Sequence, residues 1–337
     1  MVNQGHKVFV YNSHTHPFQE SSFNGVNIIH KKDPENRIGT AGQFLYDLNC
    51  ILDARKKDYD IILQLGYTSS SVWGRILPKE AIIVTNMDGL EWKRSKYNKY
   101  VRKFLKMAEK WAIHTSDFLI SDSVGIQEYI NKKYEVPSKY IPYGAELFTS
   151  PNVKLLEDYG LEEGEFNMLI ARLEPENNIE TILDGIVIGE GKNPFIVVGK
   201  HETSYGEYLK DKYKGEEHIK FLGGIYNIEH LNNLRFFSNI YFHGHSVGGT
   251  NPSLLEAMAS GCLIAAHNNI FNKSILGSDA LYFKNKNDVA LLLGTKKVTN
   301  QEKVNNNFDK IKIEYTWENI NQQYENYLIE CLNWKFE

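Results

Sequence analysis

The stretch of sequence that most constrains the fold runs from residue 236 to residue 261, where an apolar run, a glycine turn and a helix start follow one another. Residues 240–242 are typical of a buried strand, and Pro252 fits the first position of a helix. Backbone N–H groups and the positive end of the helix dipole meet in the turn between them. We therefore predict an anion site in this glycine turn, which consists of Gly248, Gly249, Thr250 and Asn251.

Three further residues of the C-terminal half are candidates for contact with a nucleotide diphosphate. Glu256 can accept hydrogen bonds from ribose hydroxyls, or it is simply an exposed glutamate. Arg172 follows an expected strand and can donate two parallel hydrogen bonds to a diphosphate; the alternative is a surface ion pair with Glu174 or Glu176. Gly199 ends the next strand, where it either allows close approach of a ligand or only ends the strand.

Apolar runs that fit strands alternate with helical patterns along the whole chain, which is typical of parallel βαβ units. A polar stretch, residues 146–165, separates two such series, and 337 residues are enough for two domains. We expect domains at residues 1–146 and 147–313. The expected strands are residues 8–11, 24–30, 60–65, 80–86, 118–121 and 140–142, then 168–171, 195–199, 219–222, 240–242, 263–266 and 281–283.

Polar residues follow two of these strands, at the sheet edge where ligands bind in open α/β folds. Asp88 and Glu91 are the best-placed carboxylates of the first domain for an acceptor hydroxyl, although Asp88 could instead cap a helix in a capping box. His243 and His245 form an H-x-H pair, but no carboxylate or thiolate cluster joins them. We therefore expect hydrogen bonding to ligand or loop rather than a metal site.

Residues 92–112 are expected to form one long helix, in which Glu109 is the single acidic residue after Trp92. Its apolar stripe would consist of Tyr100, Phe104, Ala108 and Trp111. A basic amphipathic helix is typical of contact with anionic lipid head groups, and a solvated helix face is the alternative. The cations that we expect to face the membrane are Lys99, Arg102, Lys103 and Lys106.

Charge and cysteine usage exclude several classes of protein. The formal net charge of -4 argues against a general nucleic-acid binder. The three cysteines are widely spaced, so neither a disulfide framework nor a thiolate zinc site is expected. The sequence shows no bilayer-spanning apolar run, no signal peptide, and none of the common dinucleotide, Walker, serine-hydrolase or zinc-protease motifs. We expect a cytoplasmic protein.

Four motifs together resemble one enzyme family. They lie at residues 86–92, 140–145, 171–177 and 243–256. With them, nearly the whole chain resembles the retaining GT-B glycosyltransferases of family 4, and more closely the bacterial rhamnosyltransferases of capsule and cell-wall polysaccharide synthesis. The resemblance implies an α/β fold of two Rossmann-like, doubly wound domains facing a cleft. It also implies a C-terminal helix, residues 314–337, that packs back on the first domain.

The resemblance further implies roles for individual residues. Arg172 would bind the diphosphate. The backbone amides of the glycine turn would bind the phosphates or the sugar, and Glu256 would bind the ribose. The donor would be dTDP-L-rhamnose and the acceptor a lipid-linked saccharide at the inner face of the plasma membrane. No metal or other cofactor is expected, because Arg172 and helix dipoles would meet the leaving-group charge. Asp88, Glu91 and His245 are the catalytic candidates.

The sequence departs from the family pattern at several positions. Gly248 replaces the first glutamate of a spaced pair, so His245 or Asn251 would recognise the donor sugar instead. Asn177, also a candidate donor contact, replaces a lysine, and Asp88 stands where relatives often carry a histidine. Because the given sequence starts after the strand and glycine loop with which relatives begin, we expect an incomplete first domain and weak transfer. The alternatives are a nucleotide-sugar epimerase of the same fold, or a non-catalytic member of a polysaccharide assembly complex.

Overall fold

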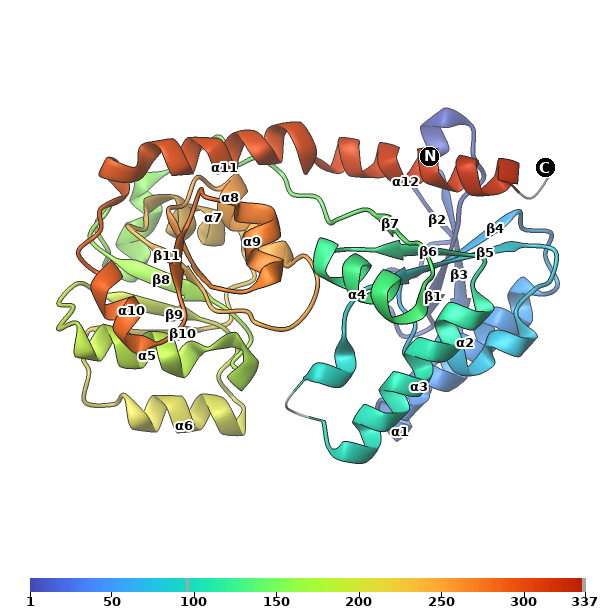
Figure 1. The fold of residues 1–337 in the computed structure, drawn as a ribbon, viewed down its shortest axis with the longest axis horizontal. Helices are drawn as coiled ribbons and strands as arrows, with labels where there is room; N and C mark the ends of the chain where they lie inside the picture. Colours follow the sequence, from blue (N-terminus) through green and yellow to red (C-terminus); the bar gives the residue numbers. More distant parts are fainter. Residues whose placement is uncertain (95–96, 335–337) are drawn as a thin grey trace.

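The computed structural model describes residues 1–94 and 97–334 and shows two α/β lobes side by side (Figure 1). The C-terminal lobe is built on a six-stranded, fully parallel sheet of order β10-β9-β8-β11-β12-β13. Its strands are β8 (Asn167–Ile170), β9 (Phe195–Val198), β10 (Ile219–Gly223), β11 (Tyr241–His243), β12 (Ile264–His267) and β13 (Leu281–Phe283).

Helices cover both faces of this sheet, and each face has its own apolar core. The strand order runs outward from β8 in one direction and from β11 in the other, so the chain switches direction between these two neighbours. The helices are α5 (Ile179–Ile188), α6 (Ser204–Lys212), α7 (Ile228–Phe237), α8 (Pro252–Ala259), α9 (Ile270–Leu276), α10 (Lys286–Leu292) and α11 (Gln301–Glu314).

The N-terminal lobe contains two separate sheets. The parallel sheet β4-β5-β6-β7 consists of β4 (Ile61–Gln64), β5 (Ile82–Met87), β6 (Phe118–Ser121) and β7 (Lys139–Tyr140). The smaller sheet, of order β1-β3-β2, consists of β1 (Phe9–Ser13), β2 (Ser22–Phe23) and β3 (Val26–Lys31). The helices of this lobe are α1 (Glu35–Ile38), α2 (Ala41–Ala54), α3 (Lys99–Thr115) and α4 (Val124–Tyr134).

Two local predictions, one in this lobe and one in the segment that follows it, need correction. The strand expected from residue 24 begins at Val26, because Asn24 and Gly25 have φ angles of 48° and 81° and form the turn of a hairpin with β2. The polar stretch expected as a linker contains a short 3₁₀ helix, Val153–Tyr159, with Leu156 buried in the C-terminal core.

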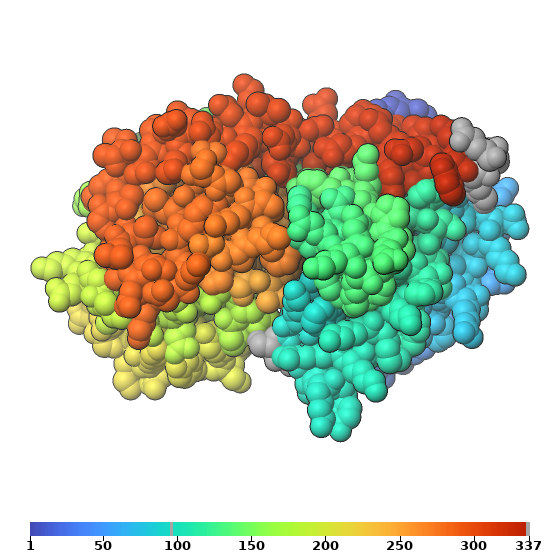
Figure 2. All heavy atoms as spheres, viewed as in Figure 1, coloured from blue at the N-terminus to red at the C-terminus, as the bar shows by residue number. Residues whose placement is uncertain are grey.

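The last helix, α12 (Trp317–Trp334), crosses from the C-terminal lobe to the N-terminal lobe, as Figures 1 and 2 show. Its buried residues Ile320 and Cys331 pack against strands β5 and β6. The chain thus passes between the lobes twice, and the two passages meet where the Ala145 backbone N–H donates to the Tyr315 carbonyl oxygen at 2.8 Å.

The long basic helix begins later than the charge pattern predicts. Asn98 caps its N-terminus by accepting hydrogen bonds from the N–H groups of Tyr100 and Val101, so α3 starts at Lys99. Ser95 and Lys96, within the expected helix, lie outside the described residues. The predicted apolar stripe is only partly correct, since Ala108 is buried whereas Tyr100 is 73% exposed.

Glu109, counted in the sequence as the lone acid of a charged helix, is 1% exposed. Its carboxylate accepts hydrogen bonds from four groups. These donors are Trp92 Nε1 at 2.9 Å, Tyr129 Oη at 2.8 Å, Tyr134 Oη at 2.5 Å and Lys133 Nζ at 2.8 Å. Glu109 therefore joins α3, α4 and the turn before α3 into one unit.

Replacing Glu109 with alanine should lower the free energy of unfolding by about 1–3 kcal/mol, because buried donors lose their acceptor. Glu128→Gln, at an exposed position of α4, should change it by less than about 0.5 kcal/mol. Urea denaturation of both variants measures the difference. Equal stabilities of the two variants would show that the Glu109 network contributes nothing to folding.

Candidate functional site

A cleft of about 240 Å³ lies between the lobes, at the carboxyl ends of β8 and β11 where the strand order switches direction. Ligands of open α/β sheets bind at such switch points. The cleft brings together most of the candidate residues. From the N-terminal lobe it is lined by Asp88, Glu91, Arg94, Asp122 and Tyr143, and from the C-terminal lobe by Arg172, Glu176, Asn177, residues 245–252, Phe271 and Asn272.

Two loops of the C-terminal lobe are tied together beneath the cleft. The Asn178 side chain donates to the Gly244 carbonyl oxygen at 2.7 Å, and Ser246 Oγ donates to the Glu176 carbonyl oxygen at 2.7 Å. A Cβ on Gly244 would lie 2.0 Å from the Asn177 carbonyl oxygen, so only glycine permits this approach. The loop that carries Arg172 and the loop that leads to the glycine turn are thereby held side by side.

The glycine turn also contacts the opposite lobe. Thr250, 3% exposed, donates its hydroxyl to the backbone oxygen of Asp122, which follows strand β6. A Cβ on Gly249 would lie 1.9 Å from Asp122 Oδ1, so the loop backbone passes directly over this carboxyl group. Asn251 uses its side chain to cap α8, accepting from the Ser253 N–H at 2.9 Å.

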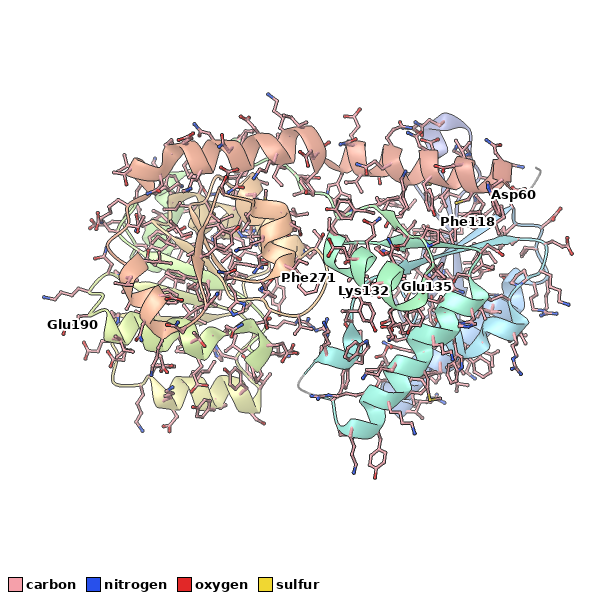
Figure 3. All side chains as sticks on the ribbon, in the orientation of Figure 1. Asp60, Phe118, Lys132, Glu135, Glu190 and Phe271 are labelled. Carbon is pink, nitrogen blue, oxygen red and sulfur yellow. The ribbon has the colours of Figure 1, made fainter. Side chains whose placement is uncertain are left out.

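An apolar contact beside the cleft completes the closed arrangement. Figure 3 shows Phe271 of α9 projecting across the seam toward α4. It packs against the N-terminal core, and a Cβ on Gly125 would lie 2.8 Å from its ring. The space-filling view shows the two lobes meeting along this seam (Figure 2). In this structure the two lobes are therefore in contact around the cleft.

Two carboxyl groups of the N-terminal lobe meet in the cleft, and each has a buried Oδ1 with no hydrogen-bond partner among the described residues. Burial, and then the negative charge of Glu91, raise the pKa of Asp88 to about 6. Burial, and then the charge of Asp88, raise the pKa of Asp122 well above its ordinary value. Asp88 does not cap a helix, because the following 3₁₀ turn Glu91–Lys93 has Leu90 as its N-cap residue. Asp122 is a cleft residue that the sequence analysis missed.

Glu91 and Arg94 form a pair on the same side of the cleft. Arg94 Nε and Nη2 each lie 2.8 Å from Glu91 Oε1, so this carboxylate is engaged in holding a guanidinium. Arg94 Nη1 lies 3.9 Å from Glu174 Oε2 of the opposite lobe. The sequence analysis assigned Arg94 to the basic helix, and the cap at Asn98 is the signal that separates it from that helix.

The two histidines stack beneath the glycine turn, with ring centroids 4.4 Å apart. Burial, and then the positive charges of Arg172 and Arg94, lower the pKa of His245 to about 4, and burial lowers the pKa of His243. Both rings are therefore neutral at pH 7. His245 lines the cleft, whereas His243 lies inside the lobe with neither ring nitrogen hydrogen-bonded among the described residues.

Three residues that are candidates for contact with the sugar donor make contacts within the protein itself. Asn177 donates its side-chain amide to the Arg172 carbonyl oxygen at 2.7 Å. Gly199 is not a cleft-lining residue; its Cβ position lies 2.0 Å from the Ala171 carbonyl oxygen, so it serves close packing. Glu256, also outside the cleft lining, accepts from Nη2 of the buried Arg235 at 2.5 Å and is 38% exposed at its side chain.

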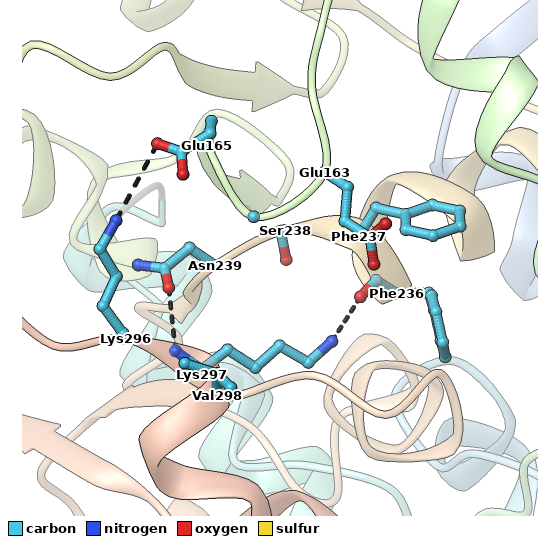
Figure 4. Close-up of a pocket in the computed structure, with 10 residues that line it drawn as sticks. Glu163, Glu165, Phe236, Phe237, Ser238, Asn239, Lys296, Lys297 and Val298 are labelled. Atoms are coloured by element: carbon cyan, nitrogen blue, oxygen red, sulfur yellow. Dashed lines mark hydrogen bonds and ion pairs between the residues drawn. The ribbon is translucent and has the colours of Figure 1, made fainter.

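A larger hollow, of about 510 Å³, lies elsewhere on the C-terminal lobe (Figure 4). The Lys297 ammonium donates to the Phe236 carbonyl oxygen, and Lys296 lies 4.0 Å from Glu165. The two lysines of this hollow thus have partners, and none of the candidate site residues lines it. The lining residues are 163–165, 236–239 and 296–298.

Within the described ranges, no group of three or more His, Cys, Asp or Glu side chains is arranged to hold a metal ion. Helices long and apolar enough to cross a membrane are likewise absent from the part of the chain that the structure describes. The cleft therefore offers carboxyl groups, two guanidinium groups, neutral imidazole and backbone amides as its chemical groups.

The raised pKa of Asp88 predicts a pH-dependent cost to stability. The pKa of Asp88 in the folded protein, about 6, exceeds its ordinary value of 3.8. The protonated carboxyl group therefore stabilises the fold fully below pH 4, and this stabilisation is lost as the pH rises through 6. Asp88→Asn should therefore raise the free energy of unfolding at pH 7.5 by up to about 3 kcal/mol relative to its effect at pH 4. Urea denaturation at both pH values tests this, with the exposed Asp58→Asn as control. An unchanged pH dependence in Asp88→Asn would contradict it.

Comparisons with known proteins match two family models to separate parts of the chain and a fold to nearly all of it. Residues 156–314 match the family described as glycosyl transferases group 1, and residues 7–146 match a domain of unknown function, DUF1972. No curated protein matches the sequence. A matching solved structure is sucrose-phosphate synthase from Thermosynechococcus elongatus, 16% identical with a TM-score of 0.81 over 98% of this chain and 90% of that one.

Two other structures agree with this match. Anabaena HepE in complex with UDP-glucose is 17% identical, with a TM-score of 0.75 over 91% of this chain and 86% of that one. TarM is 15% identical, with a TM-score of 0.66 over 84% of this chain and 58% of that one. The chain therefore has the GT-B fold, and its residues 156–314 match the model of glycosyl transferases group 1.

Proposed function

We propose that the protein is a glycosyltransferase that binds a nucleotide sugar in the cleft between its lobes. The observation that supports this most directly is the meeting of Arg172 with the glycine turn at the switch point of the C-terminal sheet. A guanidinium and a run of backbone N–H groups at one edge of a sheet form a diphosphate-binding arrangement. The HepE structure, with UDP-glucose bound, shows a protein of this fold in complex with a nucleotide sugar.

The transfer step breaks the bond between the anomeric carbon and the diphosphate oxygen and forms a bond from that carbon to an acceptor hydroxyl oxygen, whose proton passes to the leaving diphosphate. Arg172 and the N–H groups of the glycine turn stabilise the charge that develops on the leaving diphosphate. Asp88 and Asp122 face the sugar from the other lobe and accept or donate hydrogen bonds at its hydroxyls. Neutral His245 supplies a further hydrogen-bonding nitrogen at the same place. Retention of the anomeric configuration is proposed from the resemblance.

Donor entry requires the lobes to separate. The cleft of about 240 Å³ is smaller than the roughly 300–1,000 Å³ of most ligand pockets, and the Thr250–Asp122 contact closes its floor. The two passages of chain that meet at Ala145 and Tyr315 provide the hinge. Closure after donor binding then brings Asp88 and Asp122 to the sugar and excludes water from the reacting bond.

We further propose dTDP-L-rhamnose as the donor and a lipid-linked saccharide of surface-polysaccharide synthesis as the acceptor. The donor proposal comes from the resemblance to rhamnosyltransferases, together with Gly248 in place of a sugar-binding glutamate. The acceptor proposal is supported by α3, where Lys99, Lys103 and Lys106 are exposed. Arg102 is partly buried and Tyr100 is 73% exposed on the same helix. Exposed cations beside aromatic rings suit a surface of anionic lipid.

Arg172→Ala should weaken binding of the nucleotide-sugar donor by about tenfold or more, because one charge-assisted hydrogen bond contributes about 1.5–3 kcal/mol. Calorimetry with dTDP-, UDP- and GDP-sugars measures the affinity and identifies the base. Lys200→Ala is the matched control, since Lys200 is an exposed cation after the neighbouring strand β9 and does not line the cleft. Equal affinities of both variants would remove Arg172 from the site. Conversion of donor alone to an isomer would favour the epimerase.

Replacing Lys99, Lys103 and Lys106 together with glutamine should reduce binding to vesicles of phosphatidylglycerol, since each cation near an anionic surface contributes about 1 kcal/mol. Sedimentation with vesicles measures the bound fraction, and vesicles of phosphatidylcholine are the control. A triple variant at Lys210, Lys212 and Lys214, in and just after α6 of the other lobe, carries the same charge change. Equal loss in both triple variants would contradict a membrane-facing role for α3.

A further inference from the structure

We propose that Arg94, from the N-terminal lobe, binds the donor diphosphate together with Arg172. This inference rests on the proposed function and names a residue that the C-terminal family match does not contain. In this proposal one diphosphate contacts both lobes, and its negative charge holds the two lobes together.

The cleft has two side chains with a fixed positive charge among its described lining residues, and they come from different lobes. Arg172 follows β8, and Arg94 follows the turn after β5. Asn177, which could supply a neutral contact, already donates to the Arg172 carbonyl oxygen. A diphosphate carries at least two negative charges and gains more as the sugar leaves. Arg172 alone therefore leaves charge uncompensated, and Arg94 is the cation that can meet it.

Arg94 is held in one orientation rather than extended into solvent. Glu91 Oε1 accepts from both Nε and Nη2 at 2.8 Å, which fixes one edge of the guanidinium plane. The remaining edge, which carries Nη1, faces the opposite lobe, where Glu174 Oε2 lies 3.9 Å away. The side chain is 18% exposed. A guanidinium fixed at one edge and directed across a cleft at the other is preorganised for an anion.

The turn that carries Arg94 is itself anchored at two points. The Trp92 indole N–H donates to the buried Glu109 carboxylate at 2.9 Å. The Tyr67 hydroxyl donates to the Gly89 carbonyl oxygen at 2.8 Å, and Leu90 is 3% exposed. These contacts attach the turn to α3 and to the core of the N-terminal lobe. Arg94 therefore moves with its lobe, and closure of the lobes brings it to the ligand.

The position of His245 shows that both guanidinium groups lie around the same space. The positive charges of Arg172 and of Arg94 each lower the pKa of this imidazole, to which both are therefore near. His245 lies just before the glycine turn. Arg94, Arg172 and His245 all line the same cleft as the glycine turn, so a diphosphate bound there would meet a guanidinium from each lobe.

The alternative is that Arg94 only clasps the lobes through Glu174. At 3.9 Å this ion pair is long, and its two side chains are 18% and 23% exposed, so its own contribution to closure is small. The two accounts differ in their prediction for Glu174. If Arg94 binds phosphate, neutralising Glu174 leaves binding unchanged or tighter, because a competing negative charge is removed. If Arg94 is a clasp, Glu174→Gln weakens binding as much as Arg94→Ala does.

Calorimetry on the full chain decides between them. UDP and dTDP are the nucleotide probes, the corresponding monophosphates test the dependence on phosphate number, and inorganic pyrophosphate is the base-independent probe. Arg94→Ala should weaken diphosphate binding about tenfold or more and monophosphate binding much less. Arg94→Lys should recover part of the loss, and Glu174→Gln should bind at least as tightly as the unaltered protein. Circular dichroism shows whether each variant is folded.

The outcomes separate this inference from the proposed function. Loss of binding in Arg172→Ala but unaltered affinity in Arg94→Ala overturns the role of Arg94 and leaves the proposed function standing. Equal losses in Arg94→Ala and Glu174→Gln overturn it in favour of the clasp. A change confined to the acceptor KM places Arg94 at the acceptor and also overturns it. Absence of binding of UDP, dTDP and inorganic pyrophosphate to the unaltered protein contradicts the proposed function itself.

Discussion

The structure depends on one contact, in which the glycine turn of the C-terminal lobe lies against Asp122 of the N-terminal lobe. A side chain at Gly249 would overlap the Asp122 carboxyl group, so the contact requires glycine there. Because this contact brings the lobes together at the switch point of the sheet, it creates the cleft and buries Asp122, which keeps the pKa of this carboxyl group raised. The same turn is the part of the cleft that we propose to hold a diphosphate, so donor binding and the contact between the lobes are linked.

Much of the fold could be predicted because its signals are local. Strand β9 is an uninterrupted apolar run, and strands β5 and β11 each begin with one. The two halves of the site could also be predicted, since strand ends of a parallel sheet share one edge. Arg172 and the glycine turn lie together there, and Asp88 and Glu91 face them from the other lobe. The proposed roles of these residues remain proposals.

One error passed over a local turn signal, and the others arise where contacts with residues distant in the sequence decide the structure. Asn24 and Gly25 form a turn whose signal is in the sequence, but an apolar run was expected to extend through it. Asn98 resembles any polar residue of a charged helix, and only its capping contacts separate Arg94 from α3. Glu109 is surrounded by lysines in sequence but buried in space. Asp122 is next to serines that suit a helix cap, and its place in the cleft depends on a loop 128 positions later. No local sequence pattern predicts contacts with residues that lie far away in the sequence.

The central claim is that one ligand occupies the cleft and contacts both lobes. Hydrogen–deuterium exchange with and without a nucleoside diphosphate sugar tests it directly, because exchange reports protection segment by segment. The account predicts protection at the loops after β8 and β11 and, in the other lobe, at the turn after β5. Protection confined to one lobe, or centred on the hollow around residues 236–239 and 296–298, would contradict it.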